Sequence, residues 1–363
     1  MPRRSTQFSL LALAASLAGA GLSMSGAALA HEAPQAAAPH AVSASASTTG
    51  ARTATRHCPL SKLLVPRCGV MFGAFVRPEG GQSSEEAFRS LERRTGSQLK
   101  VFHFYHGGNQ LFPSSWEIKL SNQGHRLLLN WKPEAGNSWA AVANGASDAY
   151  LDREAAYLRS HYAHKKFFLV IHHEPEEEVI NTPGSGYTAA NFAAMFRHVE
   201  NRLRSHGVHN ALYVMTYMGA QVHAIKPWYN QLWPGRKYVD WIGFDRYSAP
   251  PMGEQTGGFK AMVNRHWGDG PWRGAYRWAH RKFPRKPVLL AEWGASEKPG
   301  DPGWKSRLFA SVTQDLRQMP NIKLISYFDS AASTGGDKRV DSSATSMRAW
   351  QRLAARPMFH RPR

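Results

Sequence analysis

The sequence predicts an α/β fold in which eight parallel strands close into a single (β/α)8 TIM barrel. Apolar runs of strand length recur between Gly69 and Phe328, and each is nearly continuous in hydrophobic character. Such runs are typical of parallel strands that are buried on both faces. Polar, helix-like stretches separate most of the runs, as expected for repeated strand–helix units. The 57–363 segment has a length that suits one such barrel domain.

The predicted strands are short, and the chain between them is long enough for a crossover helix. The structural alternative is an open, doubly wound sheet. It lacks support because neither G-x-G-x-x-G nor G-x-x-x-x-G-K-[ST] follows any of the runs. We expect the strands at Gly69–Val76, Leu99–Tyr105, Arg126–Trp131, Phe167–Ile171, Leu212–Thr216, Val239–Phe244, Val288–Ala291 and Leu324–Phe328.

Helical patterns lie between most of these strands. Ser84–Thr95 starts with a Ser-x-Glu-Glu sequence that is suited to cap a helix. The second strand–helix unit is the weakest, since Ser114–Asn122 offers only a short helix. Three longer amphipathic stretches are expected at Asp148–Ala163, Ala189–Ser205 and Trp304–Gln318.

The N-terminus resembles a secretory signal peptide. Arg3 and Arg4 precede an apolar run over residues 8–22, and Ala28-Leu29-Ala30 offers a small-residue cleavage site. A membrane anchor is the weaker interpretation, because the run is short and interrupted by Gly and Ser. We therefore expect residues 1–30 to be removed and the protein to be secreted, by a Sec or a Tat route that two arginines do not decide.

The segment that follows predicts a linker and then the start of the folded domain. Residues 31–56 are mostly Ala, Ser, Thr and Pro, too poor in large apolar side chains to form a core. Cys58 and Cys68 are the only cysteines. In an exported chain this pair predicts a disulfide, and two cysteines so spaced do not make a zinc site.

The chain is strongly basic, with a formal net charge of +19. Its basic residues are scattered rather than gathered into one block, and no nucleic-acid-binding motif is present. We therefore expect no nucleic-acid partner. A weak association with an anionic cell wall stays open. The sequence does not indicate an oligomeric state.

Two glutamates emerge directly from predicted buried strands. Glu174 follows the strand at Phe167–Ile171, and Glu292 follows the strand at Val288–Ala291. In a barrel of this type, functional groups gather at the carboxyl ends of the strands. A buried strand rarely ends in a carboxylate that lacks a partner or a task. Cleavage of a glycosidic bond needs two carboxyl groups that flank it, so this pair predicts glycoside hydrolysis.

Aromatic and imidazole side chains crowd the same predicted strand ends, where aromatic faces suit sugar rings. Trp293 is equally well interpreted as a core residue. A metal site on His172 and His173 is disfavoured, because neighbouring residues of a strand point in different directions. We predict no metal and no cofactor, with structural calcium left open, and a solvated loop for Glu176 to Glu178. The candidate substrate-binding residues are His106, Trp131, His173, Tyr247, Trp293 and Tyr327.

The motifs around the two glutamates resemble a known enzyme group. HHEPE (His172–Glu176) and LLAEWG (Leu289–Gly294) are similar to the catalytic motifs of clan A glycoside hydrolases. His173 before the first glutamate, and VDWIGFDRY (Val239–Tyr247), resemble glycoside hydrolase family 26, the β-mannanase family. The resemblance spans roughly residues 68–350 of this chain.

This resemblance implies a retaining mechanism, with Glu174 as acid/base, Glu292 as nucleophile and Tyr247 in contact with the nucleophile. It further implies a secreted endo-β-1,4-mannanase that acts on a plant-type polysaccharide. A β-glucanase, a β-xylanase and a non-catalytic carbohydrate-binding barrel are the alternatives. Family members often carry a tryptophan platform at the last strand, where this chain has ISYFDS (Ile325–Ser330). The sugar, its linkage and endo or exo action stay open.

Overall fold

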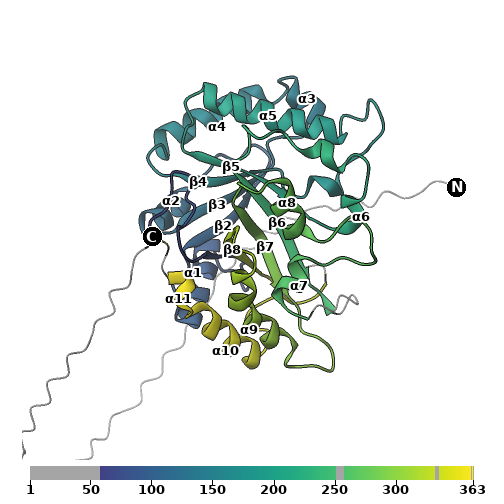
Figure 1. Cartoon of the computed structure of the whole chain (residues 1–363). Coiled ribbons are helices and arrows are strands. Elements are labelled where there is room, and N and C mark those ends of the chain that lie inside the picture. Colours follow the sequence, from purple (N-terminus) through teal and green to yellow (C-terminus); the bar gives the residue numbers. More distant parts are fainter. Residues whose placement is uncertain (1–57, 251–256, 332–334, 361, 363) are drawn as a thin grey trace, which may run out of the picture. The chain divides into compact units, whose positions relative to one another are not determined.

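Eight parallel strands form a closed barrel and follow one another around it in chain order (Figure 1). The computed structural model describes residues 58–250, 257–331, 335–360 and 362, so the predicted signal peptide and linker lie outside the described residues. The strands are β1 (Met71–Val76), β2 (Val101–His106), β3 (Arg126–Trp131), β4 (Phe167–Ile171), β5 (Ala211–Tyr217), β6 (Trp241–Ser248), β7 (Val288–Ala295) and β8 (Ile322–Asp329).

Helices surround this barrel and connect its strands (Figure 1). The predicted (β/α)8 fold is therefore confirmed. The α-helices are α1 (Ser84–Thr95), α2 (Ser115–Asn122), α3 (Trp139–Ala143), α4 (Asp148–His161), α5 (Ala189–Ser205), α6 (Gln221–Ala224), α7 (Phe259–Val263), α8 (Ala275–Lys282), α9 (Trp304–Arg317), α10 (Ala344–Ala354) and α11 (Pro357–His360). Two 3₁₀ turns are η1 (Pro175–Glu177) and η2 (Tyr229–Leu232).

The helix starts are set by local capping. In α1 the Ser83 hydroxyl accepts the backbone N–H of Glu86, whose carboxylate in turn accepts the N–H of Ser83, a complete capping box. The helix ends at Gly96, whose φ of 66° is readily adopted by glycine. The short α2 begins with the same device, built from Ser114 and Glu117.

Two strands run further than their apolar residues predict. β6 was expected to end at Phe244 and β7 at Ala291, yet their ladder continues from Asp245 opposite Glu292 to Ser248 opposite Ala295. Tyr247 and Glu292 thus lie inside strands rather than just beyond them. The reason is that backbone pairing between neighbouring strands continues where the side chains turn polar, and the apolar pattern does not report this pairing.

β7 contains a bulge just before Glu292. On the β6 side, Leu290 pairs with Phe244 and Glu292 pairs with Asp245, so Ala291 is one residue in excess. The register to β8 shifts over the same stretch. A bulge interrupts the alternation of side chains between the two faces of a strand. Ala291 belongs to the apolar cluster inside the barrel, whereas Trp293 belongs to the cluster between barrel and helices.

The apolar core is divided into these two clusters. The outer one fills the space between strands and helices, and the inner one fills the barrel itself. Leu64 closes one end of the inner cluster, and the carbonyl of Leu63 accepts the indole N–H of Trp241 at 2.9 Å. The inner cluster consists of Leu64, Met71, Val101, Leu128, Phe168, Val170, Leu212, Val214, Trp241, Leu289, Ala291 and Leu324.

The segment that carries Leu64 is held by a disulfide between Cys58 and Cys68, as predicted. Closing a loop of this kind stabilises a fold by roughly 2–3 kcal/mol in the chain-entropy account. Among the helices formed by the described residues, none combines the length and apolarity required to cross a bilayer.

Candidate active site

The first candidate glutamate lies in a tight turn at the end of β4. His172 and Glu174 both have left-handed backbone angles, with φ of 48° and 50°. Non-glycine residues adopt this conformation only when the surroundings impose it, at a cost of about 1–3 kcal/mol each. The turn is anchored on both sides, because the N–H of His172 donates to the carbonyl of Trp131 at 2.8 Å and the N–H of Glu174 donates to that of Thr216 at 3.2 Å.

The side chain of His172 anchors the same turn from behind. Its Nδ1 contacts the carboxylate of Glu134, and its Nε2 lies 3.4 Å from Glu178. Glu134 also accepts the indole N–H of Trp139 at 3.1 Å. Burial lowers the pKa of His172, but the contacts with Glu134 and Glu178 outweigh it and raise this pKa above its ordinary value. His172 is therefore a structural residue of the turn.

Glu174 has the electrostatic character of a general acid. Burial and the negative charge of Glu292 hold the pKa of Glu174 well above its usual value of 4.5. The charges of Glu176 and Glu177 act in the same direction, while Arg246 opposes them. A carboxyl group with a raised pKa keeps its proton near neutral pH, so it can deliver that proton to a substrate oxygen.

Glu292 has a different environment, because two tyrosine hydroxyls donate to its two carboxylate oxygens. Tyr105 of β2 donates to Oε1 at 2.5 Å, and Tyr247 of β6 donates to Oε2. Hydrogen bonds to both oxygens favour the ionised, oriented form of a carboxylate. Glu292 is 7% exposed, so it is screened from bulk water while it lies at the open end of the barrel strands. This is the environment of a nucleophile.

Two further carboxyl groups lie close to this pair. Asp245, opposite Glu292 in the ladder, is buried, and burial together with Glu292 and Glu174 raises its pKa far above the ordinary value. Glu176 is 2% exposed, and burial raises its pKa to about 7. Its carboxylate accepts the N–H of Gly219 at 3.2 Å. The expectation of a solvated Glu176 is therefore wrong, because the 3₁₀ turn after Glu174 folds this side chain inward.

His173 lies beside Tyr105, the tyrosine that donates to Glu292. Its ring is 5.6 Å from that of Tyr105, centroid to centroid. Burial lowers the pKa of His173 below its ordinary value, against the opposing effect of the negative charge of Glu292. On the inner face of β2, burial lowers the pKa of His103 to about 4. Both imidazoles are therefore neutral at pH 7 and suited to hydrogen bonding.

Three of the predicted sugar-binding aromatic residues are instead buried in the layer between barrel and helices. Trp131 and Tyr327 are at most 1% exposed, and Trp293 is fully buried. The Trp131 indole donates to the Tyr150 hydroxyl at 2.9 Å, and Trp293 packs edge-on against Tyr327 at 4.9 Å. Their positions follow from side-chain alternation on β3 and β8 and from the bulge on β7. None of the three has a face available for a sugar in this structure.

His106 is also directed away from the two glutamates. Its Nε2 lies 3.0 Å from the carboxylate of Glu117, and its ring stacks on Phe112 at 4.9 Å. The side chain thus fastens the start of α2 to the end of β2. The neighbouring residue Tyr105 has the opposite orientation on β2. Tyr105, rather than the predicted His106, therefore points into the site.

Tyr105 and Asp245 are the site residues that the sequence reasoning missed, and strand alternation could have indicated both. Val101 of β2 lies inside the barrel, so Tyr105, four residues later, faces the same side. Trp241 of β6 lies inside the barrel, and Asp245, also four residues later, faces the same side. Phe328 of β8 completes the lining, with its partly exposed ring 6.0 Å from that of Tyr247.

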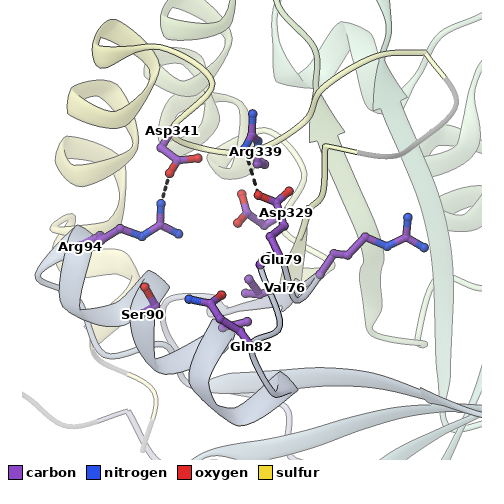
Figure 2. Close-up of a pocket in the computed structure, with 11 residues that line it drawn as sticks. Val76, Glu79, Gln82, Ser90, Arg94, Asp329, Arg339 and Asp341 are labelled. Carbon is purple, nitrogen blue, oxygen red and sulfur yellow. Dashed lines mark hydrogen bonds and ion pairs between the residues drawn. The ribbon is translucent and has the colours of Figure 1, made fainter. Parts of the chain in front are cut away.

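A polar pocket opens beside the ends of β1 and β8 (Figure 2). Its volume is about 460 Å³, and charged side chains of both signs line it. Arg94 pairs with Asp341, and Arg339 pairs with Glu79 at 3.0 Å. In the described parts of the chain, this pocket included, no group of three or more His, Cys, Asp or Glu side chains is arranged to hold a metal ion.

Solved structures with the same architecture include several β-mannanases of glycoside hydrolase family 26. The catalytic domain of a Bacillus sp. JAMB-750 endo-β-1,4-mannanase superposes with a TM-score of 0.56 and 16% identity, over 81% of this chain and 88% of that one. A β-mannanase from Bacteroides ovatus gives a TM-score of 0.55 and 18% identity, over 80% and 90%.

A third neighbour is a β-mannanase from a symbiotic protist of the termite Reticulitermes speratus, solved with a gluco-manno-oligosaccharide. It has a TM-score of 0.51 and 15% identity, and the match covers 85% of this chain and 99% of that one. No protein-family model matches the sequence, and no curated protein is significantly similar to it. At these identities the likeness establishes a shared fold, the one that the resemblance to family 26 implies.

Proposed function

We propose that this protein is a secreted, retaining β-glycoside hydrolase with Glu174 as acid/base and Glu292 as nucleophile. The observation that carries the proposal is the contrast between the two carboxyl groups. Glu292 accepts hydrogen bonds from Tyr105 and Tyr247, whereas the pKa of Glu174 is raised by burial and by Glu292. One ionised and one protonated carboxyl group is the combination that glycoside cleavage requires.

The proposed reaction is a two-step displacement. Glu292 attacks the anomeric carbon while Glu174 protonates the departing oxygen, which leaves as an alcohol. Glu174, now a carboxylate, then removes a proton from water, and this water attacks the anomeric carbon of the glycosyl-enzyme and releases Glu292. Tyr105 and Tyr247 orient the nucleophile, and His173 is placed to bond a substrate hydroxyl.

The most specific form of the proposal is an endo-β-1,4-mannanase that acts on a plant-type polysaccharide. It is supported by the motif resemblance to family 26 and by structural neighbours that are described as β-mannanases. A β-glucanase or β-xylanase would use the same two carboxyl groups. A non-catalytic carbohydrate-binding barrel is less consistent with a site in which both glutamates and their supporting tyrosines are present.

Secretion is supported by the N-terminal sequence and by the Cys58–Cys68 disulfide, which suits an oxidising compartment. We retain a weak association with an anionic wall as part of the proposal, because the chain is strongly basic. A protein that acted only as a wall adhesin would be retained by walls equally well after loss of Glu174 or Glu292.

The deciding experiment is a panel of β-mannan, mixed-linkage β-glucan and β-xylan, with product sizing and proton NMR of the first product. We expect release of oligosaccharides from mannan with the β anomer formed first. An α anomer as first product would overturn the retaining mechanism. The Glu292→Ala variant serves as the control for contaminating activity, and a wild type that is inactive on the whole panel would overturn the hydrolase proposal.

A further inference from the structure

Lys338 is a buried lysine next to the tyrosine that supports the nucleophile. It is 1% exposed, and its Nζ lies 4.9 Å from the centroid of the Tyr247 ring. The hydroxyl of that ring donates to Glu292. We propose that Lys338 is a positioning residue that acts through Tyr247 to hold Glu292 as an oriented carboxylate. The inference rests on the proposed function, since it assigns Lys338 a role in that reaction.

The loop after β8 places Lys338 through its backbone. The N–H of Lys338 donates to the carbonyl of Ser330 at 2.9 Å, and its own carbonyl accepts the hydroxyl of Tyr327 at 2.6 Å. Two residues later, the N–H of Val340 donates to the buried carboxylate of Asp329 at 2.6 Å. These bonds tie the residue on both sides to the end of β8.

The next residue along the loop takes the opposite direction. Arg339 pairs with Asp337 at 2.7 Å. It also pairs with Glu79 at 3.0 Å at the polar pocket (Figure 2). A second buried lysine, Lys305, contacts the carbonyl of Arg339 and lies 2.9 Å from the hydroxyl of Ser342. These contacts and the backbone bonds of Lys338 anchor the loop. The Nζ of Lys338 also donates to the carbonyl of Gly336 at 3.4 Å, which helps to hold the ammonium group beside Tyr247.

Gly294 makes room for this arrangement. A Cβ at this position would lie 3.1 Å from Cδ of Lys338 and 3.2 Å from the ring of Tyr247. Such distances are shorter than ordinary contacts, so any side chain there would push both groups away. The aliphatic part of Lys338 and the ring of Tyr247 thus pack together against Gly294, a position of β7 without a side chain, two residues after Glu292.

A cation over an aromatic face is attracted by the ring, and more strongly where water is excluded. The positive charge makes the phenol a stronger donor, which strengthens its hydrogen bond to the carboxylate. Three further groups that act on the Tyr247 hydroxyl are Glu292, Tyr105 and Asp245. In addition, the guanidinium of Arg265 donates to the backbone carbonyl of Tyr247 at 3.3 Å. Burial lowers the pKa of Lys305 to about 8, and the like charge of Lys338 acts in the same direction. Glu292 itself faces Glu174, Asp245, His173, His103 and both tyrosines.

The test compares Lys338→Met, Lys338→Arg and Lys305→Met. We expect Lys338→Met to move the acidic limb of the kcat/KM profile to higher pH by about one unit, the effect of one nearby charge at an effective dielectric of ~20. Lys338→Arg should keep the acidic limb close to its wild-type pH. Lys305→Met should lower the melting temperature and leave the pH of the acidic limb unchanged. An unmoved limb in Lys338→Met would overturn the inference.

A double-mutant cycle tests the path through the tyrosine. In a Tyr247→Phe background, Lys338→Met should cause a much smaller further loss of kcat/KM than in the wild type, because the hydroxyl is already absent. Equal losses in the two backgrounds would contradict action through Tyr247. If Lys338→Met does not fold, Gly294→Ala tests the same inference, because the added methyl group should push Lys338 away from Tyr247. This variant should also move the acidic limb to higher pH.

A readout without turnover separates this inference from the proposed function. In protein labelled with ¹³C at glutamate carboxyl groups, the Glu292 signal is assigned through its loss in Glu292→Gln. We expect this signal to titrate at higher pH in Lys338→Met than in the wild type. Identical titrations would overturn the inference even in an active enzyme. A shifted titration in a protein that cleaves no polysaccharide would support the inference while the proposed function fails.

Discussion

The hydroxyl of Tyr105 and Oε1 of Glu292 lie 2.5 Å apart, although two strands separate β2 from β7 around the barrel. Tyr247 reaches the other carboxylate oxygen from the adjacent β6. The candidate nucleophile is therefore held from two directions. A carboxylate with one donor can rotate about its terminal torsion, and a second donor on the other oxygen restricts that rotation.

Removal of either tyrosine hydroxyl should reduce catalysis more than stability. We expect Tyr105→Phe and Tyr247→Phe each to lower kcat by about 10- to 100-fold, because each removes one hydrogen bond to a charged group, worth about 1.5–3 kcal/mol. Steady-state kinetics and circular dichroism provide the measurement.

Tyr162→Phe is the matched control for these variants. Its hydroxyl pairs with Ser121 at 2.5 Å, between α2 and the end of α4. It should lose stability by about 1 kcal/mol and keep its kcat. If a folded Tyr105→Phe enzyme turns over at the wild-type rate, that tyrosine has only a structural role.

The two glutamates should give different phenotypes in variants that lack them. Glu174→Ala should still form a glycosyl-enzyme from a substrate with a good leaving group, and azide should release a sugar azide of retained configuration. Glu292→Ala should form no covalent intermediate, and azide rescue should give the inverted sugar azide. Mass spectrometry of the trapped enzyme and NMR of the azides measure both, and the same configuration from both variants would contradict the assignment.

The exposed charge of Glu177 should affect the pKa of Glu174, the proposed general acid. It is one of the negative charges that raise the pKa of Glu174, so its removal should lower that pKa. We expect Glu177→Gln to move the basic limb of the kcat/KM profile to lower pH by a few tenths of a unit, roughly the size of a solvent-screened interaction.

Asp269→Asn is the matched control, since Asp269 is a fully exposed carboxylate on the loop after α7. It should leave the basic limb in place. A shift of this limb to higher pH in Glu177→Gln would contradict the electrostatic account, whereas a weaker effect at high salt would agree with it.

Burial of Glu154 should make the stability of the fold fall as pH rises. Glu154 is fully buried on α4, accepts the N–H of Phe112 at 3.3 Å, and has its pKa raised by burial to about 9. The pKa of Glu154 in the folded protein lies above its ordinary value of 4.5, which applies to the unfolded chain. Burial of the protonated side chain therefore contributes its full stability only below pH 4.5. This stability is lost as pH rises towards the folded pKa.

Glu154→Gln supplies a neutral side chain of the same shape and should remove this loss. We compare the free energy of unfolding of the variant with that of the wild type. The difference should shift in favour of the variant by about 1 kcal/mol or more between pH 5 and pH 8. Urea unfolding across this range is the measurement. If the difference in stability between wild type and variant is the same at every pH, Glu154 does not titrate in the folded protein.

Local sequence was sufficient to predict the strands and most of the helices, and it singled out the two glutamates as candidates. A buried parallel strand needs a continuous apolar run, and a helix start needs a capping residue, so both leave a signal within a few residues. The carboxyl ends of barrel strands collect functional groups, so Glu174 and Glu292 stood out where apolar runs ended. The prediction of the disulfide needed only the two cysteines and an N-terminal sequence that resembles a signal peptide.

The tertiary structure decided which neighbours of those glutamates join them. Alternation alone would direct Leu289, Ala291 and Trp293 to one face of β7, yet the bulge directs Trp293 outward. Register between strands depends on pairing with residues distant in sequence, and a shift of one residue exchanges the two faces.

For the same reason Tyr105, and not His106, meets Glu292, and Lys338 reaches Tyr247 from a loop that is 91 residues further along the chain. These contacts join β2, β6, β7 and the loop after β8, and no window of local sequence contains any two of their members. Only closure of the barrel brings them together, because it carries the strand ends to one rim and so sets the distances on which the chemistry depends.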